Sequence, residues 1–375
     1  MNNWKKCKLG DIAEITMGQS PKSEFYNFDN IGMPFLQGNR TFGRKYPYFD
    51  TYCTEYKKIA KKGEILFSVR APVGDINFAN NDICIGRGLC SMNAKNGENE
   101  FLYYLLHNLR SVIINNESGS VFGSVNKNDL QTIEILLPLL EEQRQIAAIL
   151  SSIDDKIELL HEQNKTLEKL AQTLFRHYFI ENPNPSWQEK PLSEIARFLN
   201  GLACQKYPPK NFLDKLPVLK IKELSDGAIG KNSDYASSEI ADDYIVNSGD
   251  VIFSWSATLM VKIWGGEKSV LNQHLFKVSS DKYPKWFFYY WTKHHLREFI
   301  TISQAHATTM GHIKRKDLDN AMCKIPKDEY LKKCDLEISP KIQKIENNLN
   351  QIRTLKNTRD ILIPKLLNGE IKINN

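Results

Sequence analysis

The chain has 375 residues, which is more than one ordinary hydrophobic core holds and favours two or three domains. Hydrophobic residues make up 41% and charged residues 25%, a composition typical of globular proteins, and no apolar run approaches the ~18 residues that a membrane span needs. No hydrophobic segment follows the N-terminus and the seven cysteines form no Cys-x-x-Cys pair, so we expect a cytoplasmic protein with reduced thiols, no disulfide framework and no membrane partner.

The net charge of +6 is unevenly distributed along the chain. Two mildly basic blocks, residues 1–140 and 182–375, flank an acidic block at 141–181. Mild basicity permits a polyanionic partner but does not require one.

Residues 1–140 predict an α+β domain, called head 1. It opens with a short amphipathic helix and a strand-like run, and a polar stretch rich in Asn, Gly and Lys follows. An apolar, β-prone strand is expected at 65–69 and an aromatic-rich helix at about 100–115. A Ser/Gly-rich loop, a short helix and a strand closed by Pro138 end the head. Because its strands come from distant parts of the segment, the head is α+β.

Residues 141–181 have the pattern of a long helix. Apolar residues recur at steps of three and four, which is the a/d stripe of a coiled coil. The stripe from 150 to 174 would span about 36 Å of helix. A polar residue, Asn164, interrupts it at an a-like position, where asparagine commonly fixes the register. The stripe consists of Leu150, Ile153, Ile157, Leu160, Asn164, Leu167, Ala171 and Leu174.

The second half of the chain repeats the first, as head 2 (182–326) and a second helix (327–375). Five blocks recur in the same order at offsets between 183 and 188 residues. For example, Gly63-Glu64-Ile65-Leu66-Phe67-Ser68 returns as Gly249-Asp250-Val251-Ile252-Phe253-Ser254, 186 residues later. The second heptad stripe consists of Ile338, Ile342, Ile345, Leu349 and Ile352, with Leu355 and Leu362 less regularly placed.

Two arrangements of the helices are compatible with this pattern. Each helix can lie on its own head, or the two can pair with each other. The pairing is favoured, and with one head between the helices it is most simply antiparallel, holding the heads at a fixed distance. The expected fold is therefore two tandem α+β heads, each followed by a heptad helix, with an internal pseudo-twofold repeat.

The chain lacks the motifs of the enzymes that act on DNA. An adenine methyltransferase needs an Asn/Asp-Pro-Pro-aromatic tetrad, and Asn182-Pro183-Asn184-Pro185 lacks the proline pair and reads as a hinge. The spacing in Gly265-Gly266-Glu267-Lys268-Ser269 is wrong for a phosphate-binding loop. A metal-dependent nuclease needs clustered carboxylates with a lysine, and Asp50 with Glu55 and Lys57 is too closely spaced. We therefore expect no catalytic residue and no metal site.

This duplicated head and helix resembles the specificity (S) subunits of type I restriction–modification systems, over nearly the whole chain. The motifs that carry the resemblance are Trp-x4-Leu-x-[Asp/Glu]-Ile-Ala at each head start, residues 63–74, 85–88, 271–276 and 312–318, and Leu137–Ile146 entering the first helix. The resemblance implies that each head is a target-recognition domain for one half of a bipartite, asymmetric site in double-stranded DNA. It implies that the helices space the heads and dock two methyltransferase (M) subunits, with restriction and motor (R) subunits completing the complex. S-adenosylmethionine, ATP and Mg²⁺ would then bind the partner subunits, and no cofactor would bind this chain.

Head 2 departs from head 1 at one of these motifs. Arg70-Ala71-Pro72-Val73-Gly74 has no counterpart there, where the sequence is Ser256-Ala257-Thr258-Leu259-Met260. The heads are therefore expected to read different half-sites.

Candidate base contacts are long polar side chains in loops that join apolar strands. In head 1 they are Gln37, Asn39, Arg40, Arg44, Lys45, Arg70 and Arg87, and in head 2 Lys220, Lys222, Trp255, Gln273, His274, His306, Thr308 and Thr309. Candidates for phosphate contacts are Ser118, Ser120, Ser124, Lys127, His312 and Lys314.

One pair of candidates is more specific. Arg87 aligns with Gln273 at the 186-residue offset. Arginine suits the O6/N7 edge of guanine and glutamine the N6/N7 edge of adenine. The alternative is that both side chains bond within their own heads.

Two other functions stay open at this point. The first is a fused bifunctional restriction and methylation enzyme, which the missing motifs disfavour. The second is a coiled-coil interaction protein with no nucleic-acid role, which the basic heads and polar loops disfavour.

Overall fold

The computed structural model describes residues 4–115, 123–230, 232–305 and 311–373. The chain divides into two compact units. Unit 1 comprises Met1–Asp155 with Asn357–Asn375, and unit 2 comprises Lys156–Lys356. Both division points lie inside the long helices, so each unit contains one head and a part of each helix.

The described residues of head 1 form three sheets and three α-helices. The order β2-β10-β7-β8 forms a four-stranded antiparallel sheet, β3-β5-β4-β9-β6 a five-stranded mixed sheet, and β1-β11 a two-stranded ribbon. The strands are β1 (Lys5–Lys8), β2 (Ala13–Met17), β3 (Tyr26–Asn27), β4 (Met33–Leu36), β5 (Tyr52–Cys53), β6 (Ile59–Ala60), β7 (Ile65–Ser68), β8 (Ile76–Phe78), β9 (Ile83–Ile85), β10 (Leu89–Ala94) and β11 (Glu134–Leu137). The helices are α1 (Leu9–Ile12), α2 (Asn99–Asn115) and α3 (Lys127–Gln131).

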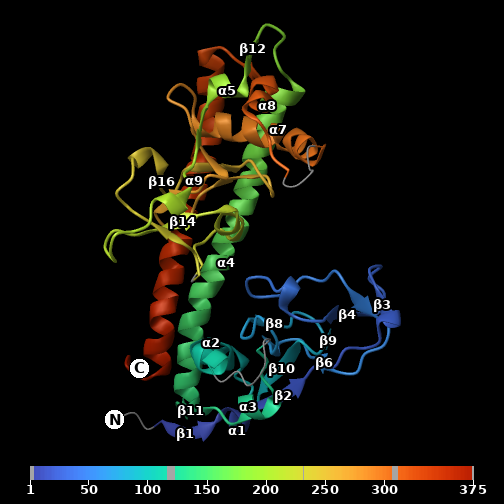
Figure 1. Ribbon diagram of the computed structural model, residues 1–375. Coiled ribbons are helices and arrows are strands. Elements are labelled where there is room, and N and C mark those ends of the chain that lie inside the picture. The colour runs from blue at the N-terminus through green and yellow to red at the C-terminus, as the bar shows by residue number, and fades with distance from the viewer. Residues whose placement is uncertain (1–3, 116–122, 231, 306–310, 374–375) are drawn as a thin grey trace. The chain divides into compact units, whose positions relative to one another are not determined.

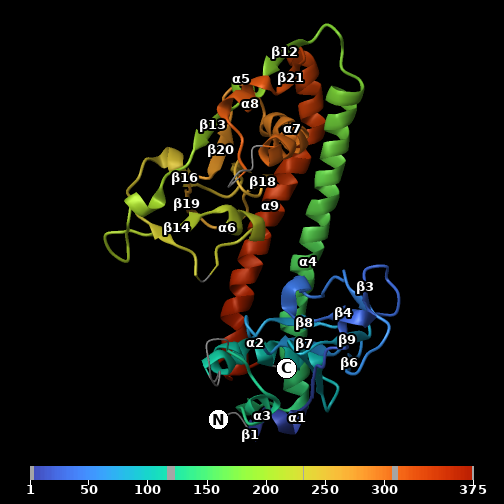
Figure 2. The same cartoon turned by 45° about the vertical axis from the view of Figure 1, so that its right-hand side comes forward.

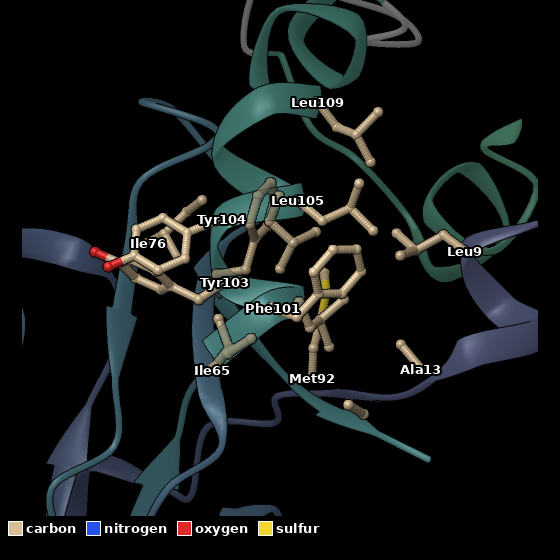
Figure 3. Packing of buried hydrophobic residues seen from close by; sticks show 14 of the residues in the cluster. Leu9, Ala13, Ile65, Ile76, Met92, Phe101, Tyr103, Tyr104, Leu105 and Leu109 are labelled. Carbon is tan, nitrogen blue, oxygen red and sulfur yellow. The ribbon is translucent and has the colours of Figure 1, made fainter. Parts of the chain in front are cut away.

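The four-stranded sheet of head 1 buries both of its faces. Alternate residues of a strand point to opposite faces, and in β7 Phe67 joins the main core while Leu66 joins a second cluster with Ile85 of β9. The main core lies under α2, where Phe101 points toward Met92 of β10 and Leu105 toward Leu9 of α1 (Figure 3). The sheet is thus packed between α2 and the strands that carry the polar loops.

Head 2 repeats this topology in its described residues, except that its mixed sheet has four strands and no counterpart of β3. Its sheets have the orders β13-β20-β17-β18, β15-β14-β19-β16 and β12-β21, and β14 pairs with β19 in parallel as β4 does with β9. Figure 2 shows β14, β19 and β16 together with the short helix α6. The strands are β12 (Gln188–Pro191), β13 (Arg197–Asn200), β14 (Leu216–Leu219), β15 (Tyr235–Ala236), β16 (Ile245–Val246), β17 (Val251–Ser254), β18 (Met260–Ile263), β19 (Ser269–Leu271), β20 (Leu275–Ser279) and β21 (Met322–Ile325). The helices are α5 (Leu192–Ile195), α6 (Ile221–Asp226), α7 (Lys285–Ala305) and α8 (Arg315–Asn320).

The two long helices are α4 (Leu140–Arg176), which ends in a π-helical turn at His177–Glu181, and α9 (Asp328–Leu367) (Figure 1). They pair antiparallel within each unit. In unit 2, Asn164 of α4 bonds Asn348 of α9. Tyr178, in the π-helical turn after α4, bonds Glu337, which lies earlier in α9. In unit 1, Asp154 of α4 pairs with Arg359 of α9 at 2.7 Å.

The heptad positions lie toward the interior. Buried members are Leu150, Ile157, Leu160, Ala171, Ile338, Ile342, Ile345 and Ile352. Half-buried members are Ile153, Asn164, Leu167, Leu174, Leu349, Leu355 and Leu362. Several of them also pack on the heads, since Leu150 belongs to the core of head 1 and Ile338 to that of head 2. The stripe therefore joins helix to helix and helix to head.

The tryptophan that opens each head is an anchor to the helix that follows it. Trp4 Nε1 donates to Glu142 Oε2 at 2.8 Å. In head 2 the ring of Trp187 lies 5.0 Å from that of Tyr330. Tyr330 and Glu142 are equivalent at the 188-residue offset, so the repeat preserves the anchoring position while its chemistry differs.

The predicted fold class is confirmed: both heads are α+β, and both are followed by a long helix. The aromatic-rich helices appear as α2 and α7. Among the described residues no helix is long and apolar enough to cross a membrane.

Candidate DNA interface

The polar loops of head 1 meet where parallel strands β4 and β9 end. Gln37 follows β4, and Gly86-Arg87-Gly88 follows β9. A Cβ at Gly86 would lie 2.7 Å from Gln37 Oε1, and one at Gly88 2.5 Å from the Gln37 carbonyl oxygen. Such contacts are too close for any side chain, so the two glycines let the loop close around Gln37 and present Arg87 beside it.

Hydrogen bonds hold this edge of head 1. Ser20 Oγ donates to Gln37 Oε1 at 2.8 Å, and the backbone N–H of Arg87 donates to Ser20 Oγ at 3.2 Å. Arg70 is the second residue after β7, and it forms an isolated antiparallel bridge with Ser124. Gln37, Arg70, Arg87 and Ser124 are all exposed. We call these four residues the head 1 edge.

Three further candidates of head 1 already have protein partners. Asn39 Nδ2 donates to Asp75 Oδ2 at 2.6 Å, and Arg40 pairs with Asp50 at 2.8 Å. The Arg40 hydrogen bond lowers the pKa of the Asp50 carboxyl. Lys45 pairs with Asp155 at 2.9 Å, and only 19% of its side chain is exposed. Burial alone would lower the pKa of Lys45, but the hydrogen bond and charge of Asp155 outweigh it and raise that pKa. Arg44 is exposed.

The same place in head 2 has different chemistry. Lys220 follows β14 and pairs with Asp234, and Gln273 and His274 follow β19. The His274 ring contacts Gln273 Nε2 at 3.2 Å through Nε2 and Ser256 Oγ at 3.1 Å through Nδ1. The edge therefore combines an amide, an imidazole and a cation.

Two aromatic residues complete the head 2 edge. The centroid of the Trp255 ring lies 6.1 Å from that of His274 and 6.2 Å from that of His312, and Trp255 Nε1 donates to Asn200 Oδ1. Ser256 bridges His312 as Arg70 bridges Ser124 in head 1. We call Lys220, Trp255, Gln273, His274 and His312 the head 2 edge.

The remaining candidates are either exposed or lie outside the described residues. Lys127, Lys222 and Lys314 are exposed, on or beside the short helices α3, α6 and α8. Ser118, Ser120, His306, Thr308 and Thr309 lie outside the described residues. That any of the candidate residues contacts DNA stays a prediction.

The sequence reasoning missed the residues that support the two edges. Ser20 and Ser256 bond base-reading candidates, but both are short and polar, as many loop residues are. The offset of 186 that aligns Arg87 with Gln273 also aligns Arg70 with Ser256, which was the available signal. Within the described residues, no group of three or more His, Cys, Asp or Glu side chains could hold a metal ion.

Known proteins resemble this chain in sequence and in fold. The profile of the family described as type I restriction modification DNA specificity domain matches residues 1–169 and 184–358. The chain belongs to this family. Both heads are therefore copies of one family domain, and the predicted membership is confirmed.

Individual relatives match either nearly the whole chain or about half of it. The type I restriction enzyme MjaIX specificity subunit of Methanocaldococcus jannaschii is 28% identical and is matched over 99% of this chain and 94% of its own length. A putative MjaX specificity subunit of the same organism is 42% identical over 46% of this chain and 41% of its own. The crystal structure of the S subunit from M. genitalium shares the fold, with a TM-score of 0.57 at 17% identity, over 100% of this chain and 97% of that one.

These relatives decide between the predicted functions. Specificity subunits are the non-catalytic members of type I systems, so the family assigns this chain to recognition. The comparisons support neither the fused enzyme nor the coiled-coil protein without a nucleic-acid role.

Proposed function

We propose that this chain is the subunit that selects the DNA sequence for a type I restriction–modification complex. Each head reads one half of a bipartite, asymmetric site in double-stranded DNA. The observation that carries the proposal is the pair of polar edges. Two heads of related topology place hydrogen-bonding side chains at the ends of equivalent strands, exposed in head 1 and half-buried in head 2, yet the side chains differ. Two heads that share a fold but differ in the side chains at their edges could read two different half-sites.

The two edges suit different bases. Arg87 offers a fork of donors, which matches the O6 and N7 acceptors of guanine in the major groove. Gln273 offers one donor and one acceptor, which match N7 and N6 of adenine. The lysines around both edges suit phosphates, which set affinity without reading the sequence.

The partners follow from the same proposal. Two M subunits dock on the long helices, and R subunits complete the restricting complex. Exposed apolar side chains of α4 in unit 2 support a docking role, since Leu159 is 60% exposed and Leu170 48%. S-adenosylmethionine, ATP and Mg²⁺ bind these partners, and the assembly acts on DNA in the cytoplasm.

The experiment is a matched exchange between the heads. The chain is produced with its cognate M subunit, and the methylated motif is determined by methylation-sensitive sequencing of a randomised DNA library. Wild type is expected to give two short motifs around an unspecified gap. Gln273→Arg should change one half only, and Arg87→Gln the other half only, because the two residues lie in different heads. The change in base preference should be large, since a bidentate contact discriminates by about 1–3 kcal/mol.

Three outcomes separate the elements of the proposal. A single uninterrupted wild-type motif would remove the bipartite reading. A consensus unchanged by either exchange, at normal affinity, would leave Arg87 and Gln273 as structural residues. A change in both halves from one exchange would contradict independent heads.

A further inference from the structure

In head 1 a buried asparagine holds the segment from Asn39 to Pro47, which lies beside the head 1 edge in sequence and carries four of the seven base-contact candidates of this head. Three of those four also have protein partners, as described above. Asn77 lies on β8, the edge strand of the four-stranded sheet, and is 1% exposed. Its Oδ1 accepts from the backbone N–H of Gly43, and its Nδ2 donates to the Gly43 carbonyl, both at 3.0 Å. One side chain therefore satisfies both polar backbone groups of one loop residue.

The rest of β8 holds the same segment. The backbone N–H of Phe78 donates to the Lys45 carbonyl at 2.8 Å, and Asn80 Nδ2 donates to the Pro47 carbonyl at 3.4 Å. Asp75, just before the strand, accepts from Asn39. The segment from Asn39 to Pro47 is thus tied to the β8 edge at four points, and Asn77 makes the central, buried tie.

In head 2 a lysine occupies the equivalent register position. Asn77 pairs with Leu66 across β7–β8, and Lys262 pairs with Ile252 across β17–β18. Leu66 and Ile252 are equivalent in the repeat, at the offset of 186. Lys262 Nζ donates to the carbonyls of Leu224 and Ser225, at 3.1 and 2.7 Å, which lie in the last turn of α6.

The bonds of Lys262 suit its environment. The last carbonyls of a helix lack partners within the helix and carry partial negative charge, which favours a cation there. Burial lowers the pKa of Lys262, and the carbonyls compensate the desolvated ammonium with hydrogen bonds. Helix α6 carries Lys222 and begins directly after Lys220. The lysine therefore holds α6, which follows β14, as Asn77 holds the segment that follows β4.

We propose that Asn77 and Lys262 are positioning residues for base reading, each setting the conformation of the segment that follows the central parallel strand of its own head. The inference rests on the proposed function, because it assumes that these segments lie on DNA. Neither residue contacts the bases. Each fixes the backbone from which the contacts are made, and a misplacement of about 1 Å is enough to weaken a bidentate contact.

The test uses Asn77→Leu and Lys262→Met in the full chain with its cognate M subunit, on the randomised library described above. Asn77→Leu should lower discrimination about tenfold in the half-site of head 1 and leave the other half unchanged. Lys262→Met should do the reverse. Lys262→Arg keeps the cation and its donors, so it should restore the half-site that Lys262→Met relaxes.

The unaffected half-site is an internal control for folding and assembly. If wild type gives no two-part motif, the proposed function fails before the variants are compared. If wild type gives the two-part motif and both variants retain it with full discrimination, the positioning role is overturned. It is also overturned if one substitution relaxes both half-sites, or if Lys262→Arg relaxes the motif as strongly as Lys262→Met.

Discussion

A single histidine in head 1 should make the stability of the chain depend on pH. His107 lies on α2 with its ring 4.5 Å from that of Tyr103, and its buried Nε2 has no hydrogen-bond partner among the described residues. Burial, and then the nearby charge of Arg359, lowers the pKa of His107 to about 4. Asp154 opposes this shift but already pairs with Arg359 and Tyr104.

The sign of the effect follows from linkage. The unfolded chain binds a proton at His107 near pH 6.5, whereas the folded chain binds it near pH 4. Stability from this group is complete above pH 6.5 and is lost as pH falls toward 4, by at most about 1.4 kcal/mol per pH unit. In urea unfolding between pH 4 and 7, His107→Phe should lose this component of the pH dependence. Equal profiles for His107→Phe and wild type would contradict the assignment.

At the scale of the elements, the helix pair of unit 2 carries a polar contact at its centre. Asn348, which is 0% exposed, donates through Nδ2 to Asn164 Oδ1 and to Gln163 Oε1, both at 2.8 Å. Asn164 Nδ2 and Asn348 Oδ1 have no partner among the described residues. Buried amides that are only partly satisfied lower stability but disfavour shifted pairings.

Leucine substitutions test this balance. Asn164→Leu alone should lower the unfolding free energy by about 1–3 kcal/mol, because Asn348 stays buried with one partner fewer. Asn164→Leu with Asn348→Leu should recover that loss, since both unsatisfied amides are removed. Urea unfolding of the single and double variants gives the coupling energy. Two costs that simply add would show that the asparagines do not act as a pair.

The elements differ in how far the sequence predicts them. The heptad stripe and the aromatic helices were predictable because their residues repeat at the helical period, and Asn164 was visible because it breaks that stripe. Its partner Asn348 was not, because it lies beside the stripe Ile345, Leu349, Ile352, and only the antiparallel register brings the two amides together. The roles of Asn77 and Lys262 could not be predicted from the sequence for a related reason. The strands that carry them pair at equivalent registers, but the loops before them differ in sequence, so the repeat does not align the two residues.

At the scale of the molecule, the proposed spacing role of the helices predicts a change in the DNA gap. Four residues add about 6 Å of helix, and base pairs stack at about 3.4 Å. Insertion of one turn in each helix should therefore lengthen the gap by up to about two base pairs. The insertion sites are the unit boundaries, after Asp155 and after Lys356, which leave the contacts within each unit intact.

The measurement is the methylated motif in the presence of the M subunit. The half-site sequences are expected to stay the same around a longer gap, with weaker binding because DNA also rotates by about 70° over two base pairs. A two-residue insertion is the control, since it turns the heptad stripe of each helix away from the other helix and should abolish assembly. An unchanged gap in an active four-residue variant would mean that contacts other than the helices fix the spacing.

The discontinuity of unit 1 has a consequence for synthesis on the ribosome. The core of head 1 includes Leu366 and Leu367, and Leu362 packs against it. Unit 2 is one uninterrupted stretch of the chain, whereas unit 1 is completed only by residues that lie about 200 positions after its first segment. At 5–20 residues per second, the ribosome makes those residues roughly 10–40 s later. During this interval the nascent head 1 has an uncovered apolar surface. The N-terminal head is therefore the last to complete its core, although it is the first to be translated.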